Sequence, residues 1–353
     1  MARTIMIMAG GTGGHVFPGL AVADEMRSRG WRVVWLGAPG GMESTLVPQR
    51  GYEMAWVSFA GVRRKGLLAF ALLPMRLLIA FWQAARAIFA HRPDVLLGMG
   101  GYQSFPGGMM AALFGRPLVI HEQNSVAGLA NRVLAGVADR VLCAFDGALK
   151  NATVTGNPVR PEIAALAAPE LRYRARSGKL KLLVIGGSLG ASVLNETVPR
   201  ALALMAAEQR PQVVHQSGAA HSDALARRYG EAGVLAETLA FIDDMAAAYT
   251  DADVVLCRAG ALTVSELAAA GVASILVPYP HAVDDHQTRN ARQLADAGAA
   301  VLVPQPELTP ERIALLLGEL SRERLCDMAC KARALARAGA TQAVAQNCME
   351  VAG

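Results

Sequence analysis

Residues 4–26, TIMIMAGGTGGHVFPGLAVADEM, decide the fold that we expect for this chain. An apolar run rich in β-branched residues ends at a cluster of glycines, and a helical pattern follows at once. Residues 181–202, KLLVIGGSLGASVLNETVPRAL, repeat the same order of strand, Gly-Gly-hydroxyl-x-Gly turn and helix. The two turns lie about half a chain length apart, so the repeat predicts two similar domains.

Short apolar runs alternate with longer helical segments along the whole chain. We expect strands at 4–9, 32–37, 94–98, 117–121 and 139–144, and again at 180–186, 211–216, 253–257, 274–278 and 299–304. Strands that alternate with helices form parallel sheets covered on both faces, which makes the fold class α/β and doubly wound. Such sheets bind ligands at the carboxyl ends of their strands, so two domains are expected to face one interdomain cleft.

The domain boundaries follow from this repeat and from composition. We assign 1–158 to the first domain, 159–178 to a linker region rich in Pro, Ala and charge, and 179–336 to the second domain. Residues 337–353 are expected to form a C-terminal helix that packs back on the first domain.

Composition restricts the class of partner. The chain has 353 residues, 53% of them hydrophobic, and a net charge of +5, which allow large cores and favour anionic partners. Phosphates, nucleotides and an acidic membrane surface all fit. Nucleic acid is less well supported, because the sequence lacks a basic run interleaved with aromatic residues. The five scattered cysteines indicate reduced thiols rather than a metal site or a disulfide framework.

The turn at 10–19 fails two nucleotide-binding patterns. The third glycine of a dinucleotide fingerprint falls on Val16, the second strand ends in Leu36-Gly37 without an acidic residue, and no Gly-Lys-Ser/Thr follows. An anion site at a helix N-terminus and a plain tight turn both remain open. His15 enters the helix directly behind the glycines, and an imidazole there suits a general base, although a structural role is the alternative.

Three more glycine turns follow strands, at 98–108, 186–191 and 257–266. In the last of these, CRAGALTVSE, Thr263 opens a helix and Glu266 follows about one turn later. A carboxylate there could hold both ribose hydroxyls of a nucleotide, and the alternative is a glutamate in the first turn of a helix.

Polar residues also gather at HEQNSVAGLAN, residues 121–131, directly after a buried strand. Buried polar groups need partners, so we interpret this segment as a ligand-facing turn. His121 could instead be a core histidine with its hydrogen bonds satisfied.

The acidic pairs indicate no metal site. Asp251-x-Asp253 precedes its strand, which is the wrong end of the sheet, and we interpret it as cap and surface. Asp243-Asp244 and Asp284-Asp285 are expected to be solvated or capping. We expect no cofactor and no essential protein-bound metal.

The segment 62–92 is strongly apolar, but Pro74 and Arg76 interrupt the ~20 apolar residues that a membrane span needs. One interpretation is a buried core helix. The other is an interfacial patch in which apolar residues and Trp82 insert beside anionic headgroups, ringed by basic residues. These are Arg63, Arg64, Lys65, Arg76 and Arg86.

Seven motifs, in this order, resemble those of the MurG-type glycosyltransferases over essentially the whole chain. They read GGTGGHVFPGLAVA, HEQN, TGNPVR, GGS-x-GA, FIDDM, CRAGALTVSE and DDHQTRNA. The resemblance implies the GT-B fold of two Rossmann-like domains. It also implies an inverting, metal-independent transfer of N-acetylglucosamine from UDP-N-acetylglucosamine to an undecaprenyl-linked muramyl-pentapeptide in peptidoglycan synthesis.

The resemblance further implies roles for individual residues. Contacts to the donor would come from Thr12, Gly13, Gly14, Asn124, Arg160, Ser188, Ile242, Ala261, Leu262, Thr263, Val264, Ser265, Glu266 and Gln287. Contacts to the acceptor would come from Gly11, Gly100, Gly101, Tyr102 and Ser104. His15 would be the catalytic base, with Glu122 as the second candidate.

Family members dock on the cytoplasmic face of the inner membrane, and other wall-synthesis proteins are possible partners. Departures from the family pattern occur at Leu189, at 103–105 and at His286, which affects the detailed contacts. A GT-B enzyme with another lipid or natural-product acceptor remains open. A nicotinamide oxidoreductase and a non-catalytic scaffold fit less well.

Overall fold

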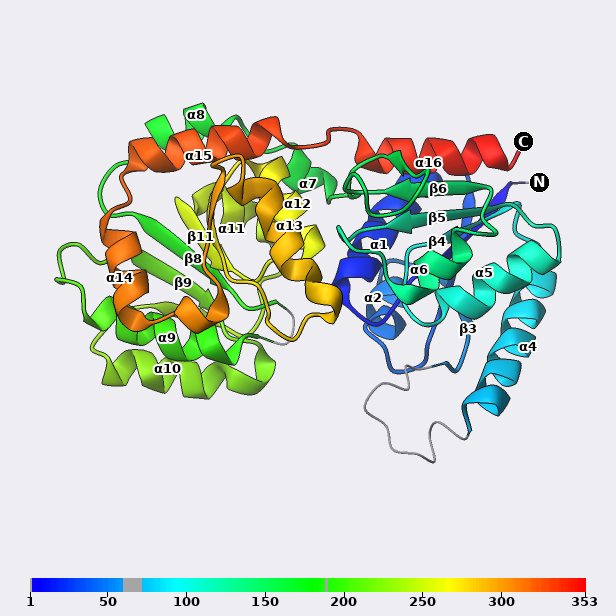
Figure 1. Ribbon diagram of the computed structural model, residues 1–353, viewed down its shortest axis with the longest axis horizontal. Coiled ribbons are helices and arrows are strands. Elements are labelled where there is room, and N and C mark those ends of the chain that lie inside the picture. The colour runs from blue at the N-terminus through cyan, green and yellow to red at the C-terminus, as the bar shows by residue number, and fades with distance from the viewer. Residues whose placement is uncertain (1, 60–71, 188–189) are drawn as a thin grey trace. The chain divides into compact units, whose positions relative to one another are not determined.

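The computed structural model describes residues 2–59, 72–187 and 190–353 (Figure 1). The chain divides into two compact units, Met1–Arg160 with Arg337–Gly353, and Pro161–Ala336. Each unit is built on one parallel sheet.

The sheet of the first unit has seven strands in the order β3-β2-β1-β4-β5-β6-β7. The strands are β1 (Thr4–Met8), β2 (Arg32–Gly37), β3 (Glu53–Trp56), β4 (Val95–Gly98), β5 (Leu118–Glu122), β6 (Arg140–Cys143) and β7 (Thr153–Val154). Among its described residues the helices are α1 (Gly13–Ser28), α2 (Glu43–Gln49), α4 (Leu73–His91), α5 (Ser104–Leu113), α6 (Leu129–Leu134) and α16 (Ala340–Val351).

The sheet of the second unit has six strands in the order β10-β9-β8-β11-β12-β13. The strands are β8 (Lys181–Ile185), β9 (Gln212–Gln216), β10 (Glu237–Leu239), β11 (Val254–Cys257), β12 (Ala273–Leu276) and β13 (Ala300–Leu302). The α-helices are α7 (Pro161–Ala164), α8 (Pro169–Arg174), α9 (Ser192–Ala203), α10 (Ser222–Glu231), α11 (Met245–Asp251), α12 (Ala261–Ala270), α13 (His286–Ala295), α14 (Pro310–Gly318) and α15 (Arg322–Ala334). Short 3₁₀ turns lie at Ala219–His221, Val283–Asp285 and Gln305–Glu307.

These sheets confirm the α/β, doubly wound prediction, and each strand that the sequence indicates is present. In both sheets the strand order reverses beside the first strand of the unit, between β1 and β4 and between β8 and β11. Met8 is aligned with Gly98, and Ile185 with Cys257, so the glycine turns that follow each pair leave the sheet at the same level. This reversal point is where open parallel sheets bind their ligands.

The segment expected as a linker, 159–178, carries the helices α7 and α8 of the second unit. The buried Arg172 of α8 donates to the carbonyl of Tyr249 at 3.1 Å, and also to the carbonyls of Ala270 and Gly271 at the end of α12. These bonds hold the carboxyl end of α12 in place. The amino end of the same helix follows the glycine turn after β11.

After the second unit the chain returns to the first, where α16 (red in Figure 1) packs against α1 and the strands β4, β5 and β6. Val344, Ala345 and Cys348 of α16 are fully buried in the cluster that contains Ile5, Ile7 and other core residues.

Asp253, which we expected at the surface as part of Asp-x-Asp, is fully buried, so that prediction is wrong. Its carboxylate lies 2.8 Å from Arg176 Nη1 and 3.3 Å from Arg322 Nη2, and it accepts a 2.9 Å bond from the backbone N–H of Lys181. Two guanidinium groups therefore compensate the burial of this charge. Asp244 caps α11, as expected, by accepting from Ala247 N.

Helix α4 has two apolar faces of different kind. One face is buried against the unit and consists of three alanines and an isoleucine, Ala80, Ala84, Ala87 and Ile88. Large apolar side chains are exposed, at Met75, Leu78, Ile79, Trp82 and Phe89. Among the described residues α4 is the single helix whose length and composition would allow it to cross a membrane, and most of its length is not buried in the unit. Within Leu73–His91 the buried-core interpretation thus holds for the alanine face only, and residues 62–71 of the segment lie outside the described residues.

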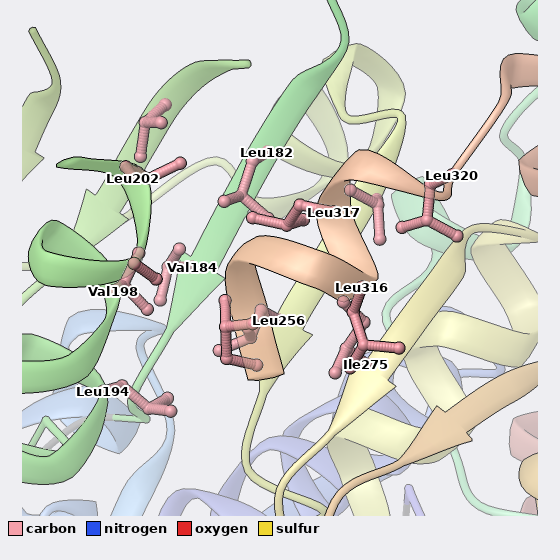
Figure 2. Close-up of a cluster of buried hydrophobic side chains, with 14 of the residues drawn as sticks. Leu182, Val184, Leu194, Val198, Leu202, Leu256, Ile275, Leu316, Leu317 and Leu320 are labelled. Atoms are coloured by element: carbon pink, nitrogen blue, oxygen red, sulfur yellow. The ribbon is translucent and has the colours of Figure 1, made fainter. Parts of the chain in front are cut away.

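The core of the second unit lies between its sheet and the helices α9 and α14 (Figure 2). Leu256 of β11 is fully buried near the middle of this cluster, with Val184 of β8 and Ile275 of β12 on the neighbouring strands.

We predict that Leu256→Ala lowers the free energy of unfolding by about 2–5 kcal/mol, because it leaves a cavity in a close-packed core. Leu235→Ala is the matched control, since Leu235 is 95% exposed, and a change within about 0.5 kcal/mol is expected there. Urea denaturation followed by circular dichroism measures both, and equal losses for the two variants would contradict the packing described above.

Candidate active site

The two glycine turns of the first unit, 10–14 and 98–102, approach each other so closely that the backbone of Gly101 contacts the backbone of Gly10, with the side chain of Gln103 beside both. A Cβ on Gly101 would lie 2.6 Å from the carbonyl oxygen of Gly10, and one on Gly10 would lie 1.5 Å from Gln103 Nε2. Gly11, Gly100 and Gly101 also have φ near +90°, a conformation that favours glycine. Backbone therefore forms the surface at the carboxyl ends of β1 and β4.

Glu43, at the start of α2, supports the two turns through hydrogen bonds, and the sequence analysis did not identify this residue. It is fully buried, and its carboxylate accepts bonds from Gly11 N (3.1 Å), Ala38 N (3.1 Å) and Gln103 Nε2 (3.0 Å). A signal was available in GAPGGMES, 37–44, where a glutamate follows glycines directly after a strand. A Cβ on Gly41 would lie 2.4 Å from this carboxylate, so the glycines make room for it.

His15 lies in the first turn of α1, after the N-cap residue Thr12, and is partly exposed. Its Nδ1 is 2.8 Å from Gln123 Oε1. Its ring lies against Gly100, where a Cβ would come within 2.9 Å of Cε1 and Nδ1. The glycine turns thus leave room for the imidazole that follows them.

The polar turn HEQN faces inward for the most part, contrary to our interpretation of it as ligand-facing. His121, Glu122 and Gln123 are each at most 1% exposed. His121 Nε2 is 2.9 Å from the carbonyl oxygen of Gly156, which confirms the alternative of a satisfied core histidine. Burial lowers the pKa of His121 to about 4, although the Gly156 carbonyl and the nearby Glu122 act in the opposite direction.

Glu122, the second candidate base, uses its carboxylate to hold the following loop. It accepts bonds from the backbone N–H and the side-chain amide of Asn124 (2.9 and 3.2 Å), from Gly128 N (3.1 Å) and from Asn131 Nδ2 (2.9 Å). Four donors on a buried carboxylate leave its oxygens fully engaged.

The other predicted acceptor and donor residues of the first unit differ in exposure. Ser104 is fully buried, and its Oγ is 2.7 Å from the carbonyls of both Met8 and Gly100, so its side chain supports the turn from inside. Tyr102 is 50% exposed. The guanidinium of Arg160 lies over the ring of Phe17 at 5.4 Å, which brings a positive charge beside the first turns of α1.

In the second unit, Gly260 is the N-cap of α12, and the helix includes all the predicted residues from Ala261 to Glu266. Glu266 lies in the second turn, so the alternative of a first-turn glutamate is wrong. Glu266 is only 4% exposed, and Oη of the buried Tyr249 donates to its Oε2 at 3.3 Å. A buried carboxylate held by a buried tyrosine suits a site for hydroxyl donors.

The remaining donor residues lie in loops of the second unit. Ile242 follows β10 and is 8% exposed, while Gln287 in the first turn of α13 accepts a 2.9 Å bond from Tyr279 N. Ser188 and Leu189, like Arg63, Arg64 and Lys65 of the basic patch, lie outside the described residues. Within the described ranges no group of three or more His, Cys, Asp or Glu residues is arranged to hold a metal ion.

Comparison with known proteins agrees with this geometry. Residues 5–143 match the glycosyltransferase family 28 N-terminal domain, and residues 181–349 match the C-terminal domain of the same family. Crystalline MurG from Acinetobacter baumannii is similar over 99% of both chains, with a TM-score of 0.85 and 40% identity. A kitacinnamycin glycosyltransferase has a TM-score of 0.73 over the full length of both chains at 19% identity, which shows the fold alone.

Two sheets with paired glycine turns at their reversal points, matched by these domains and structures, define a glycosyltransferase of the GT-B fold. The chain is 62% identical to a transferase of Dechloromonas aromatica over 100% of both chains. It is also 64% identical to one of Aromatoleum aromaticum, over 99% of this chain and 98% of that one. Both are named UDP-N-acetylglucosamine–N-acetylmuramyl-(pentapeptide) pyrophosphoryl-undecaprenol N-acetylglucosamine transferase. The chain belongs to this family, the MurG type.

We predict that Gly100→Ala lowers the rate of glycosyl transfer by about 10- to 100-fold, because the added methyl group displaces the His15 ring. The matched control is Gly51→Ala, since Gly51 also has a positive φ, of 74°, but open space at its Cβ. Both variants lose about 1–2 kcal/mol of stability from backbone strain. Steady-state kinetics that show the same transfer rate for both would contradict the contact between Gly100 and His15.

Proposed function

We propose that this chain transfers N-acetylglucosamine from UDP-N-acetylglucosamine to the 4-hydroxyl of the muramyl sugar of undecaprenyl-pyrophosphoryl-muramyl-pentapeptide. This is the step from lipid I to lipid II in peptidoglycan synthesis. The observation that carries the proposal is the full-length identity of 62% and 64% with transferases named for these substrates. The partly exposed His15, beside a backbone surface of glycines, supports it with suitable chemistry.

The reaction is one direct displacement with inversion. The acceptor oxygen forms a bond to the anomeric carbon while the bond from that carbon to UDP breaks. The acceptor proton passes to His15. Glu122 is the weaker candidate, because its carboxylate already accepts four hydrogen bonds.

Charge on the leaving UDP is met by fixed groups rather than by a chelated metal, as the family resemblance implies. The N-terminus of α12 presents backbone N–H groups and the positive end of the helix dipole to the diphosphate. The family resemblance adds the positive charge of Arg160. Glu266 accepts the ribose hydroxyls, and Ile242 lies against the uracil.

The acceptor's diphosphate lies on the glycine turns at 10–14 and 98–108. Because those turns present backbone rather than side chains, phosphate oxygens can come close to N–H groups. Tyr102 contacts the acceptor, whereas Ser104 holds the turn from inside.

The enzyme works at the cytoplasmic face of the inner membrane, where its lipid acceptor resides. The exposed face of α4 supports this location, because Met75, Leu78 and Trp82 are each more than half exposed. Arg76 and Arg86 are exposed on the same helix, and the Arg86 guanidinium lies 5.8 Å from the Trp82 ring. Apolar residues with flanking arginines suit shallow insertion among anionic headgroups.

The test of the transfer uses the whole protein with UDP-N-acetylglucosamine and a short-chain analogue of the muramyl-pentapeptide lipid. We expect UDP release only when both substrates are present, together with a disaccharide product. Glu266→Ala should raise the KM for the donor and leave the KM for the acceptor unchanged. Release of UDP with other lipid or natural-product acceptors, but not with this one, would replace the proposal by a different GT-B activity.

The test of the membrane surface changes Arg76, Arg86 and Trp82 to Ala together. Since each basic residue contributes about 1 kcal/mol at an anionic surface, we expect binding to phosphatidylglycerol vesicles to fall at least 10-fold. The control changes Arg227, Arg324 and Leu235, which are exposed in the second unit, and should bind as before. Sedimentation with vesicles measures both, and unaltered binding of the α4 variant would refute the location of the surface.

A further inference from the structure

A chain of hydrogen bonds connects the backbone carbonyl of Gly156 to His15 through His121 and Gln123. The Gly156 carbonyl determines which atom donates in each of these bonds. His121 Nε2 lies 2.9 Å from the carbonyl oxygen of Gly156. A carbonyl can only accept, so His121 donates from Nε2. His121 is fully buried, and burial lowers its pKa to about 4, so the ring is neutral near pH 7. Its Nδ1 therefore carries a lone pair.

That lone pair fixes the orientation of the next group, the side chain of Gln123. Gln123 Nε2 is 3.1 Å from His121 Nδ1 and 3.0 Å from the carbonyl oxygen of His121, and both of these atoms are acceptors. The amide nitrogen must therefore face His121, and the amide oxygen must face away from it. Asn157 Nδ2 donates to the backbone carbonyl of Gln123 at 3.1 Å and holds the residue in place.

The amide oxygen in turn fixes the proton on His15. Gln123 Oε1 is 2.8 Å from His15 Nδ1 and can only accept, so Nδ1 carries the proton and Nε2 carries the lone pair. The other tautomer would set two lone pairs against each other at this distance. A flip of the amide would not relieve the conflict, because His121 would then have to turn a lone pair toward the Gly156 carbonyl.

We infer that Gln123 and His121 are positioning residues that hold His15 as the Nδ1–H tautomer, leaving Nε2 as the atom that accepts the proton of the acceptor hydroxyl. This inference rests on the proposed function for the identity of that hydroxyl. The tautomer itself depends only on the hydrogen bonds of the first unit. The orienting group is a neutral amide, so it sets the tautomer without adding a negative charge beside the base.

The test reads the tautomer directly by nuclear magnetic resonance. The protein is labelled with ¹⁵N-histidine and recorded without substrates at about pH 8, where free imidazoles are neutral. The His15 signals are assigned by their loss in His15→Ala. We expect Nδ1 of His15 to show the shift of a protonated ring nitrogen and Nε2 that of an unprotonated one. The reverse pattern in the unmodified protein would overturn the inference.

Two variants then test the role of Gln123. Gln123→Met keeps the length of the side chain but cannot accept from His15, so we expect a mixture of tautomers and a kcat lowered at least about 10-fold. The KM for both substrates should stay unchanged. Gln123→Glu retains an oxygen that accepts from His15 Nδ1 but loses the donor that faces His121, so we expect the Nδ1–H tautomer of His15 to persist while the bonds to His121 are lost. A Gln123→Met variant in which His15 keeps a single Nδ1–H tautomer would also overturn the inference.

Failure of this inference and failure of the proposed function give different results. If the protein is an active transferase but His15 carries its proton on Nε2, the proposed function stands and the positioning role of Gln123 and His121 is overturned. If His15 shows the Nδ1–H tautomer but the protein makes no disaccharide, the hydrogen-bond chain stands and the proposed function is overturned.

Discussion

The first unit depends on the close approach of two backbone turns, which leaves no room for a side chain at the glycines where they meet. A Cβ on Gly101 would lie 2.6 Å from the carbonyl oxygen of Gly10, and one on Gly10 would lie 1.5 Å from the side-chain nitrogen of Gln103. Because these turns touch, the buried Glu43 can hold Gly11 and Gln103 at once. Because Gly100 lacks a side chain, the His15 ring can lie against the second turn and still reach Gln123. The surface for phosphate and the orientation of the imidazole thus share one cause.

The fold was largely predictable from the sequence, and the reason is local. Strands such as β1, β8 and β11 are continuous apolar runs that end at glycines, and both signals come from neighbouring residues. The short strands β3, β7 and β10 were not predicted. Each lies at the edge of its sheet and pairs with a single neighbour, so the pairing partner rather than the residues themselves makes it a strand.

The site was predictable in its residue types but not in its partners. His15 and Glu266 were identified because each follows a glycine turn at the end of a strand. The polar residues of HEQN were expected to meet a ligand, since buried polar groups need partners. The sequence does not show that the partner of His121 is a carbonyl 35 residues later. The buried Asp253 was misplaced for the same reason, because Arg176 and Arg322 approach it from distant segments.

The return of α16 to the first unit has a consequence for how the protein is made. Val344, Ala345 and Cys348 complete a core that also contains Ile5 and Ile7, so strand β1 waits for a helix that is synthesised more than 300 residues later. The second unit, Pro161–Ala336, is continuous in sequence and has all of its residues earlier. On a ribosome, therefore, the second unit can finish folding while the first still lacks one helix. The first unit is complete only after α16 has left the exit tunnel, so a chain truncated before α16 leaves that unit incomplete.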